Sequence, residues 1–325
     1  MQKSTAIACS NIAFIKYWGN ADHTLRLAAN SSLSMNLADL TVTATVAFDP
    51  ALPEDRLTIN GQPASAAAAK RVFAHLNLIR RRAGLPHRAE VRTESNFPAG
   101  AGIASSAAAF AALAVAGAAA AGLQLSEAEL SALARRGSGS ASRSVPGGYC
   151  QWLAGGSDAT SYATSIAPPE HWALHDVVAI VSTEHKRTGS SDGHALAETS
   201  VLQTARLLSA PARFLACKRA ILRRDLQTLG PLIEEDAILM HSVMMTSHPP
   251  LYYWTPATLE IIHAVQRWRA DGLPVYFTID AGPNVHLICE SRHAETVAAE
   301  ARALPGVRQV LQSGVGGPAR LLHAD

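Results

Sequence analysis

The chain is organised around the stretch Asn96-Phe-Pro-Ala-Gly-Ala-Gly-Ile-Ala-Ser-Ser-Ala-Ala-Ala-Phe110. Its small residues Gly100, Ala101 and Gly102 let a backbone approach a ligand closely, and the Ser105-Ser106 pair reads as the first turn of a long alanine-rich helix. Unpaired N–H groups at a helix start and the positive end of its dipole favour a phosphate, whose oxygens or magnesium a serine hydroxyl can hold. A plain turn before a buried helix explains the stretch equally well.

The composition limits the classes of protein to which the chain can belong. A chain of 325 residues can bury a substantial core and suggests two domains, and 48% hydrophobic and 17% charged residues are typical of a soluble globular protein. The net charge of +2 indicates no large polyanionic partner, so we expect no nucleic acid. The four cysteines lie far apart without metal-ligand spacing, which favours buried free thiols in a reducing compartment: Cys9, Cys150, Cys217 and Cys289.

Two segments bear on localisation. Residues 1–10 lack the apolar core and cleavage site of a secretory signal. Residues 100–123 carry no charge and are long enough to raise the question of a membrane span, but most are Ala or Gly, which transfer weakly into lipid. We therefore expect a helix buried in a protein core, no membrane partner and a cytoplasmic protein.

The first half of the chain reads as strands with interposed helices. Residues 5–18 form two apolar segments, and Lys16 lies near the end of the second. A lysine in this position either extends to the surface, which is the commoner case, or faces a ligand. Residues 40–48 alternate as a strand does, and Asn60-Gly61 is a hairpin turn. Helical spacing from Val72 to Ala83 stops at Gly84, and Ser126 with Glu129 predicts a capping box on a helix that ends at Gly137.

A second notable stretch is Gly137-Ser-Gly-Ser-Ala-Ser-Arg-Ser144. Glycines and hydroxyls around the single Arg143 suit a loop that wraps an anion, because arginine can hold a carboxylate with two parallel hydrogen bonds. The alternative is a polar surface linker. The immediate return to apolar residues 149–153 favours a loop placed between core elements.

The second half alternates helices and strands. Pro168-Pro169 marks a plausible domain boundary, and a strand at 177–182 precedes a helix expected from about Asp192 to Leu208. A helix at 256–271, strands at 274–279 and 285–289, and a helix at 292–303 follow, before two further strands. This alternation predicts a two-layer α+β domain.

Four separated stretches together resemble the motifs of mevalonate diphosphate decarboxylases, which belong to the GHMP kinase superfamily. In order they are Asn11-Ile-Ala-Phe-Ile-Lys-Tyr-Trp-Gly19 with Asn30-Ser-Ser, Asn96 to Ala108, Gly137 to Ser144 with Gly147-Gly148, and Asp280-Ala-Gly-Pro-Asn284. The match covers nearly the whole chain. It implies an α+β fold with a ribosomal-protein-S5-like, ATP-binding N-terminal domain (1–175), a ferredoxin-like C-terminal domain (176–325) and an active site between them.

The resemblance also implies the reaction, which belongs to the mevalonate pathway of isoprenoid biosynthesis. ATP, with Mg²⁺, would phosphorylate the tertiary 3-hydroxyl of a 5-phosphorylated mevalonate, after which phosphate and carbon dioxide leave. Hydroxide is a poor leaving group and phosphate a good one, and its loss builds positive charge at C3 that draws electrons from the neighbouring C–CO2 bond. Relatives are frequently homodimers, so a homodimer is expected.

Site residues follow from the matched motifs. Asp280 would act at the 3-hydroxyl as base or as an orienting and cation-stabilising group, with Lys16 keeping it ionised. Arg143 would hold the C1 carboxylate. Other residues expected near the substrate are Tyr17, Ser138, Ser140 and Ser191; those expected to hold the ATP phosphates are Gly100, Ala101, Gly102, Ala104, Ser105 and Ser106, with Ser105 or Ser106 near magnesium. Taken alone, Asp280 would be a turn aspartate capping a Gly-Pro loop.

Two departures from the family pattern concern the substrate. Members acting on the diphosphate commonly have a lysine where this chain has Asn20 and a basic residue where it has Asp192. Fewer cations should weaken binding of a diphosphate more than binding of a monophosphate. The sequence hypothesis is therefore mevalonate 5-phosphate as substrate, giving isopentenyl phosphate. The alternative is the 5-diphosphate, giving isopentenyl diphosphate, with Arg26, Lys186 or Arg187 supplying the charge.

Two other functions compete with decarboxylation. A mevalonate 3-kinase would stop before carbon dioxide is lost, but the chain keeps the aspartate, lysine and arginine that the whole reaction needs. A non-catalytic binding protein on this fold would be expected to show a decayed phosphate loop or to lack the aspartate, and the sequence shows neither.

Overall fold

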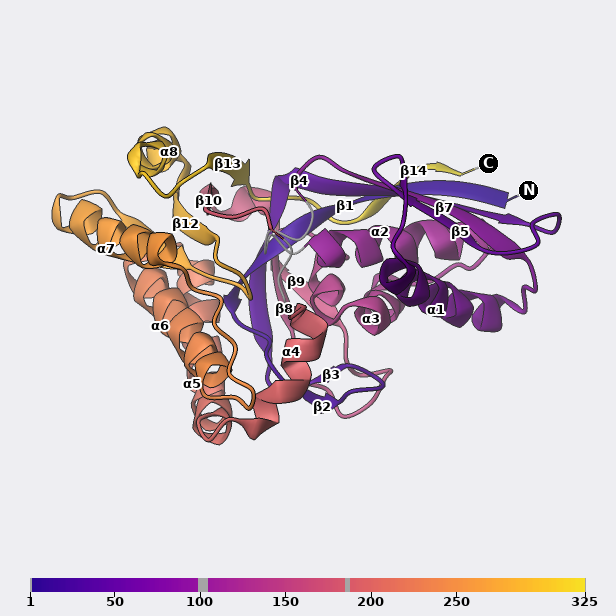
Figure 1. Ribbon diagram of the computed structural model, residues 1–325, viewed down its shortest axis with the longest axis horizontal. Helices are drawn as coiled ribbons and strands as arrows, with labels where there is room; N and C mark the ends of the chain where they lie inside the picture. The colour runs from indigo at the N-terminus through magenta and orange to yellow at the C-terminus, as the bar shows by residue number, and fades with distance from the viewer. Residues whose placement is uncertain (1, 99–104, 185–187, 325) are drawn as a thin grey trace.

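The computed structural model describes residues 2–98, 105–184 and 188–324 (Figure 1). In these ranges one large mixed sheet and one smaller antiparallel sheet are each covered by helices. The long strand β1 (Gln2–Ile15) begins in the large sheet and ends against the helices of the other half. The α+β class expected from the sequence is confirmed.

The large sheet has the strand order β14-β1-β4-β7-β5-β6, and β8 and β9 extend it beside β4. Its pairings are antiparallel except for the parallel pair β5 with β7. The last strand of the chain returns to this sheet and pairs with the first. The other strands of the sheet are β4 (Ser32–Asp49), β5 (Arg56–Ile59), β6 (Gln62–Pro63), β7 (Arg88–Ser95), β8 (Tyr149–Trp152), β9 (Ala163–Ala167) and β14 (Arg320–Ala324).

Three helices cover one face of this sheet: α1 (Ala66–Ala83), α2 (Ser105–Ala120) and α3 (Glu127–Gly137) (Figure 1). The α2 helix is buried along most of its length against β1 and β4, as its alanine content predicts, because small side chains allow close packing. The predicted capping box of Ser126 and Glu129 is present on α3, and Gly84 ends α1 in the left-handed conformation. Asn60 and Gly61 both have positive φ, as the predicted hairpin turn requires.

The smaller sheet has the order β11-β12-β10-β13 and is wholly antiparallel. Its strands are β10 (Leu174–Ile180), β11 (Val275–Thr278), β12 (Val285–Glu290) and β13 (Gln309–Gly314), and its helices are α5 (Gln203–Arg223), α6 (Leu226–Met245), α7 (Pro256–Ala270) and α8 (Ala294–Ala303). The short helix α4 (Ser190–Leu196) and the two-stranded ribbon of β2 (Asn20–Asp22) and β3 (Leu27–Ala28) lie near the junction of the halves (Figure 1). Short 3₁₀ helices span Gly139–Ser144, Pro169–His171, Ala197–Thr199 and Ser291–His293.

The prediction of one helix from about Asp192 to Leu208 is wrong. The α4 helix ends at Leu196, a 3₁₀ turn follows, and Ser200 is extended with φ −81° and ψ 130° before α5 begins at Gln203. The Ser200 hydroxyl accepts from the Leu202 N–H at 3.2 Å and contacts Thr246 Oγ1 at 2.6 Å. A serine that bonds to nearby backbone in this way competes with helix formation.

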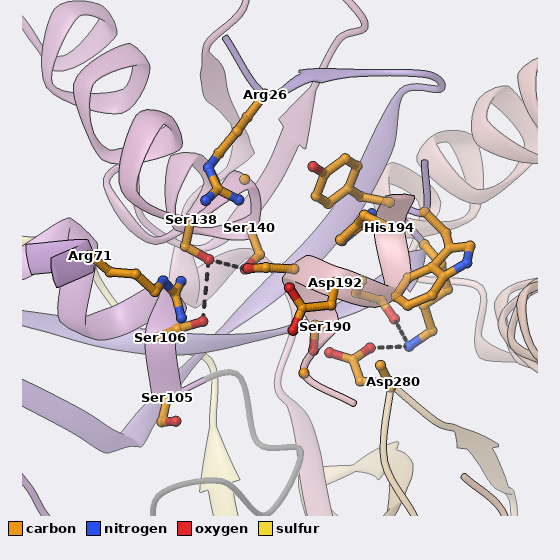
Figure 2. Close-up of a pocket in the computed structure, with 18 of the residues that line it drawn as sticks. Arg26, Arg71, Ser105, Ser106, Ser138, Ser140, Ser190, Asp192, His194 and Asp280 are labelled. Carbon is orange, nitrogen blue, oxygen red and sulfur yellow. Dashed lines mark hydrogen bonds and ion pairs between the residues drawn. The ribbon is translucent and has the colours of Figure 1, made fainter. Parts of the chain in front are cut away.

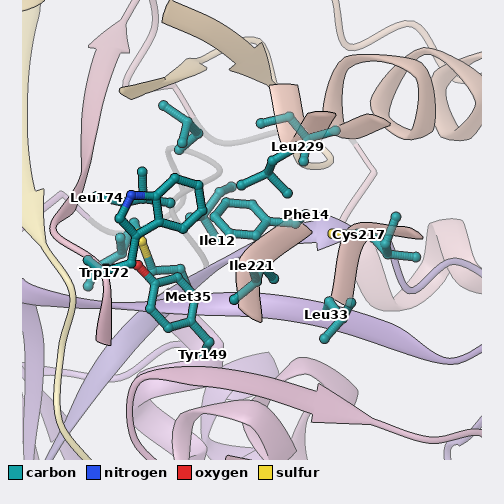
Figure 3. Packing of buried hydrophobic residues seen from close by; sticks show 14 of the residues in the cluster. Ile12, Phe14, Leu33, Met35, Tyr149, Trp172, Leu174, Cys217, Ile221 and Leu229 are labelled. Carbon is teal, nitrogen blue, oxygen red and sulfur yellow. Dashed lines mark hydrogen bonds between the residues drawn. The ribbon is translucent and has the colours of Figure 1, made fainter. Parts of the chain in front are cut away.

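One hydrophobic cluster is shared by the two halves. Ile12 and Phe14 of β1 pack in the same cluster as Trp172, Ile221 and Leu229 (Figure 3). Burying such side chains contributes about 1.5–3 kcal/mol each. A boundary at residues 175 and 176 therefore remains a prediction, since β14 and this cluster tie both parts of the chain together.

All four cysteines are buried and unpaired with one another, as expected. Among the described residues no helix combines the length and apolar character needed to cross a membrane.

Candidate active site

A cavity of about 560 Å³ lies where the two halves of the fold meet, and Figure 2 shows it. The end of β1, the helices α1, α2 and α4, the 3₁₀ turn after α3 and the loop after β11 all contribute side chains. Every described site residue expected from the sequence lines it: Lys16, Tyr17, Ser105, Ser106, Ser138, Ser140, Arg143, Ser191 and Asp280. Gly100, Ala101, Gly102 and Ala104, and the basic residues Lys186 and Arg187, lie outside the described residues.

Lys16 and Asp280 form an ion pair on one wall of this cavity. Lys16 Nζ donates to Asp280 Oδ1 at 2.6 Å and to the Ala13 carbonyl at 2.7 Å, and the lysine side chain is 1% exposed. Burial lowers the pKa of Lys16 against the opposing attraction of Asp280. Burial raises the pKa of Asp280, but Lys16, His286 and Arg143 together outweigh it, so that this pKa lies below its ordinary value. The carboxylate is thus ionised at neutral pH.

The position of Lys16 is fixed by buried charges that the sequence did not single out. Asp236 Oδ2 accepts from the Lys16 backbone N–H at 2.6 Å, and Arg206 Nη2 donates to the Lys16 carbonyl at 2.8 Å. Arg213 Nε donates to Asp236 Oδ1 at 3.1 Å, and Asn30 Nδ2 donates to the Lys16 carbonyl at 2.9 Å. This contact gives the asparagine of the Asn-Ser-Ser motif a structural role.

Two further contacts hold the loop that carries Asp280. The Asp280 carbonyl accepts from the Gly282 N–H at 2.7 Å and lies 3.2 Å from His241 Nε2. Burial lowers the pKa of His241 to about 3, so this ring is neutral and one of its nitrogens can donate to the carbonyl. Asn284 Oδ1 accepts from the backbone of Val181 and Ser182, which explains the asparagine that ends the Asp-Ala-Gly-Pro-Asn motif.

Arg143 reaches the same cavity from the 3₁₀ turn. Its Nη1 donates to Ser32 Oγ at 2.7 Å and its Nη2 to Asn11 Oδ1 at 3.3 Å, while Asn11 Nδ2 donates to Ser144 Oγ at 2.7 Å. Burial lowers the pKa of Arg143 to about 10, which still leaves it charged at neutral pH. Its Nε has no hydrogen-bond partner within the part of the chain that the structure describes. A buried guanidinium held by neutral groups suits an anionic ligand.

A row of serine hydroxyls crosses the floor between α2 and the 3₁₀ turn. Ser106 Oγ lies 3.2 Å from Ser138 Oγ, which lies 3.4 Å from Ser140 Oγ (Figure 2). Ser105 and Ser106 occupy the first turn of α2, whose leading N–H groups have no helical partner. No group of three or more His, Cys, Asp or Glu in the described ranges could hold a metal ion by itself. The hydroxyls of Ser105 and Ser106, together with phosphate oxygens, would suit a magnesium ion.

Tyr17 and Asn20 interact with each other. The Tyr17 hydroxyl donates to Asn20 Oδ1, and Asn20 is buried and does not line the cavity. The Tyr17 ring stacks on His194 at 4.1 Å between centroids, and His194 Nδ1 accepts from the Gly19 N–H at 3.0 Å. A Cβ added to Gly139 would lie 2.5 Å from Tyr17 Cε1, so the glycine allows the tyrosine to approach the turn.

The chain resembles known decarboxylases over nearly its full length. Residues 8–163 match the diphosphomevalonate decarboxylase-like N-terminal domain, and residues 176–314 match the mevalonate 5-diphosphate decarboxylase C-terminal domain. It is 36% identical to diphosphomevalonate decarboxylase mvd1 of Aspergillus fumigatus, over 94% of this chain and 81% of the relative. It is 38% identical to human diphosphomevalonate decarboxylase, over 92% of this chain and 81% of the relative. A solved complex of MDDEF with MVAPP, AMPPCP and magnesium superposes with a TM-score of 0.94 at 37% identity, covering 99% of both chains.

Proposed function

The chain belongs to the diphosphomevalonate decarboxylase family, and from that premise we propose that its substrate is mevalonate 5-diphosphate and its product isopentenyl diphosphate. At the coarser level it is an ATP-dependent decarboxylase that acts on a phosphorylated mevalonate. The observation that carries the proposal is the convergence of Lys16, Asp280 and Arg143 in one cavity beside the serine row of α2.

The reaction couples two bond-breaking steps. The 3-hydroxyl oxygen attacks the γ-phosphorus of MgATP, and the bond from that phosphorus to ADP breaks. The hydroxyl proton passes to a phosphate oxygen or to solvent. The C3–O bond then breaks with both electrons going to phosphate, and the C1–C2 bond supplies the pair that forms the C2–C3 double bond as carbon dioxide leaves. No organic cofactor is required, because the phosphorylated hydroxyl is itself the electron sink.

Asp280 and Lys16 are suited to the C3 end of this sequence. An ionised carboxylate can orient the hydroxyl for attack and stabilise the positive charge that builds at C3. The Lys16 ammonium keeps that carboxylate ionised and offsets the charge of the phosphoryl group in transfer. Both are fixed by buried hydrogen bonds, which reduces the cost of aligning them when the substrate binds.

Arg143 is suited to the C1 carboxylate. Its Nη groups are oriented by Ser32 and Asn11, and it lies in the same cavity as Asp280. Holding the carboxylate aligns the C1–C2 bond with the departing phosphate, as concerted electron flow requires. Tyr17, Ser138, Ser140 and Ser191 line the cavity where the rest of the substrate would lie.

The fit to MgATP rests on the start of α2. Ser105 and Ser106 face the cavity from the first helical turn, where the helix dipole favours phosphate. A serine hydroxyl can complete the coordination of a magnesium ion that phosphate oxygens already bind. Ser106 is the better placed of the two, because its hydroxyl joins the Ser138 and Ser140 row.

The comparisons support the diphosphate, the alternative at the sequence level, better than the monophosphate. The relatives are named for the diphosphate. Asn20 lies outside the cavity lining, so its lack of charge says little about the ligand, whereas Arg26, Lys70 and Arg71 add cations to the lining. Among the described residues of the lining, Asp192 is the feature that favours a smaller anion.

In the test, purified enzyme and MgATP are incubated with either mevalonate 5-diphosphate or mevalonate 5-phosphate. The release of ADP and the release of carbon dioxide are measured in the same reaction. We expect both products in equal amounts, with kcat/KM higher for the diphosphate. A higher kcat/KM for the monophosphate would overturn the substrate assignment. ADP without carbon dioxide would show a kinase instead of a decarboxylase.

A further inference from the structure

Two arginines of the cavity have no part in the chemistry described so far. Arg26 lies between β2 and β3, and Arg71 lies on α1. Both line the active-site cavity and also a neighbouring cavity of about 480 Å³, so they stand where the two meet. Figure 2 shows their guanidinium groups directed towards Ser138 and Ser106, at the end of the view away from Asp280.

The end of α3 holds these two guanidinium groups. Arg26 Nε donates to the Arg136 carbonyl at 3.2 Å, and Arg71 Nη2 donates to the Gly137 carbonyl at 3.4 Å. These are the last two carbonyls of α3, which have no helical partner and form the negative end of the helix dipole. One contact each ties both arginines to the end of α3 and leaves most of their N–H donors for another acceptor.

Within the described ranges, neither charge of this pair is balanced by a carboxylate in direct contact. Neither arginine forms an ion pair with any residue that the structure describes. Partial desolvation, and then the charge of Arg26, lower the pKa of Arg71 although this residue is exposed, and the charge of Asp192 opposes the shift. Two cations held close together are unfavourable until an anion lies between them.

Arg26 also has an uncommon backbone conformation. Its φ is 52°, in the left-handed region that residues other than glycine seldom adopt. Such conformations concentrate where the structure positions a functional side chain. The turn between β2 and β3 thus has a cost in backbone conformational free energy, and it directs Arg26 back towards the end of α3.

We propose that Arg26 and Arg71 together bind the distal phosphate of the substrate's 5-diphosphate. This inference rests on the diphosphate substrate proposed above. With C3 at Asp280, the 5-diphosphate lies at the other end of the carbon chain and must extend away from that wall. Two guanidinium groups that converge there match the fork geometry of phosphate oxygens, and a monophosphate would be too short to engage both.

The test measures kcat/KM for the diphosphate and the monophosphate, and KM for ATP, in the wild type and in Arg26→Gln and Arg71→Gln. Each substitution is expected to lower kcat/KM for the diphosphate by about tenfold to a hundredfold, as loss of a hydrogen bond to a charged group does. We expect little change for the monophosphate and none in KM for ATP. Arg71→Lys, which keeps the charge but loses the fork, should recover part of the loss.

The matched control is Arg81→Gln. Arg81 lies on the same helix, is exposed, and lines only the neighbouring cavity, so wild-type kinetics are expected. An unchanged ratio of diphosphate to monophosphate kcat/KM in both variants would overturn the inference, as would a loss confined to KM for ATP, which would assign the pair to the nucleotide. A wild type that prefers the monophosphate would instead overturn the proposed function, so the two failures are distinguishable.

Discussion

At the scale of single residues, the Lys16–Asp280 pair limits what Asp280 can do. A carboxylate whose pKa lies below its ordinary value is a weak base, and general base catalysis is most efficient when the pKa is near the working pH. The same ionised group is well suited to orient a hydroxyl and to stabilise a developing cation. We therefore assign the larger part of its effect to orientation and electrostatics.

Replacing Asp280 by Asn tests that assignment. Asp280→Asn keeps the size of the side chain but removes the charge, and it leaves Lys16 without its partner, so kcat should fall by about 10²–10⁴-fold. Binding of MgATP, followed by nucleotide fluorescence or calorimetry, should change little. The control is Asp271→Asn, at an exposed aspartate that follows α7. A rate within a few-fold of the wild type would remove Asp280 from the mechanism.

The sequence predicted the residues that line the cavity, but it did not predict the buried residues that hold Lys16 in position. The residues that line the cavity lie in short motifs rich in glycine, serine and charge, and such motifs indicate ligand contact. The periodic pattern alone favoured a surface position for Lys16, whereas the structure buries it. Asp236 and Arg206 contact backbone atoms of Lys16 across 220 and 190 positions of sequence, and Arg213 in turn contacts Asp236. No local pattern reports contacts over such separations.

At the scale of elements, local signals predicted helix α2, the capping box of α3 and the end of α1 well, since each depends on residues a few positions apart. The break between α4 and α5 was not predicted. At this break Ser200 bonds to the nearby Leu202 N–H and also contacts Thr246 at the end of α6, a contact that the local sequence does not report. The pairing of β14 with β1 joins the two ends of the chain and was likewise beyond local pattern.

The α1 helix contains a buried histidine that we expect to weaken the protein in acid. Neither ring nitrogen of His75 has a hydrogen-bond partner among the described residues, and burial, aided by Arg136, lowers its pKa to about 4. Below the ordinary pKa of about 6.5 the unfolded chain therefore takes up a proton that the folded chain does not. The free energy of unfolding therefore falls as the pH decreases through this window, and His75 accounts for about 2 kcal/mol of the loss at pH 5.

His75→Leu should remove that part of the acid sensitivity. Leucine has a similar volume and no polar atoms to bury, so the variant should be as stable as the wild type at pH 8, or about 1 kcal/mol more stable. Between pH 6.5 and 4 its unfolding free energy should decline less steeply. Urea unfolding at several pH values measures both. If the unfolding free energies of the wild type and the variant fall in parallel with pH, His75 has the same pKa in the folded and unfolded chains.

At the scale of the whole molecule, the active site depends on how the two halves are joined. The end of β1 enters the other half, where Asp236 of α6 accepts from the Lys16 backbone and binds Arg213 of α5. Arg206 of the same helix lies 4.0 Å from Asp236 and donates to the Lys16 carbonyl. The buried Asp236 carboxylate thus compensates two buried arginines, one of which also lies 3.9 Å from the exposed Glu235, and it sets the position of Lys16.

Replacing Asp236 by Asn should therefore weaken folding and catalysis together. The amide can still accept from the Lys16 N–H, but Arg206 and Arg213 lose the buried charge of Asp236 that compensates them, at a cost of about 3–5 kcal/mol in unfolding free energy. Because the hydrophobic cluster spans both halves, denaturant should still give one unfolding transition, at a lower midpoint.

Catalysis by the same variant is measured at low temperature, where it is folded. There kcat should drop with little change in KM for ATP, since Lys16 shifts relative to Asp280. Asp271→Asn serves again as control. An unchanged midpoint would show that the arginines find compensation elsewhere, and an unchanged kcat would show that the β1 end holds Lys16 without Asp236.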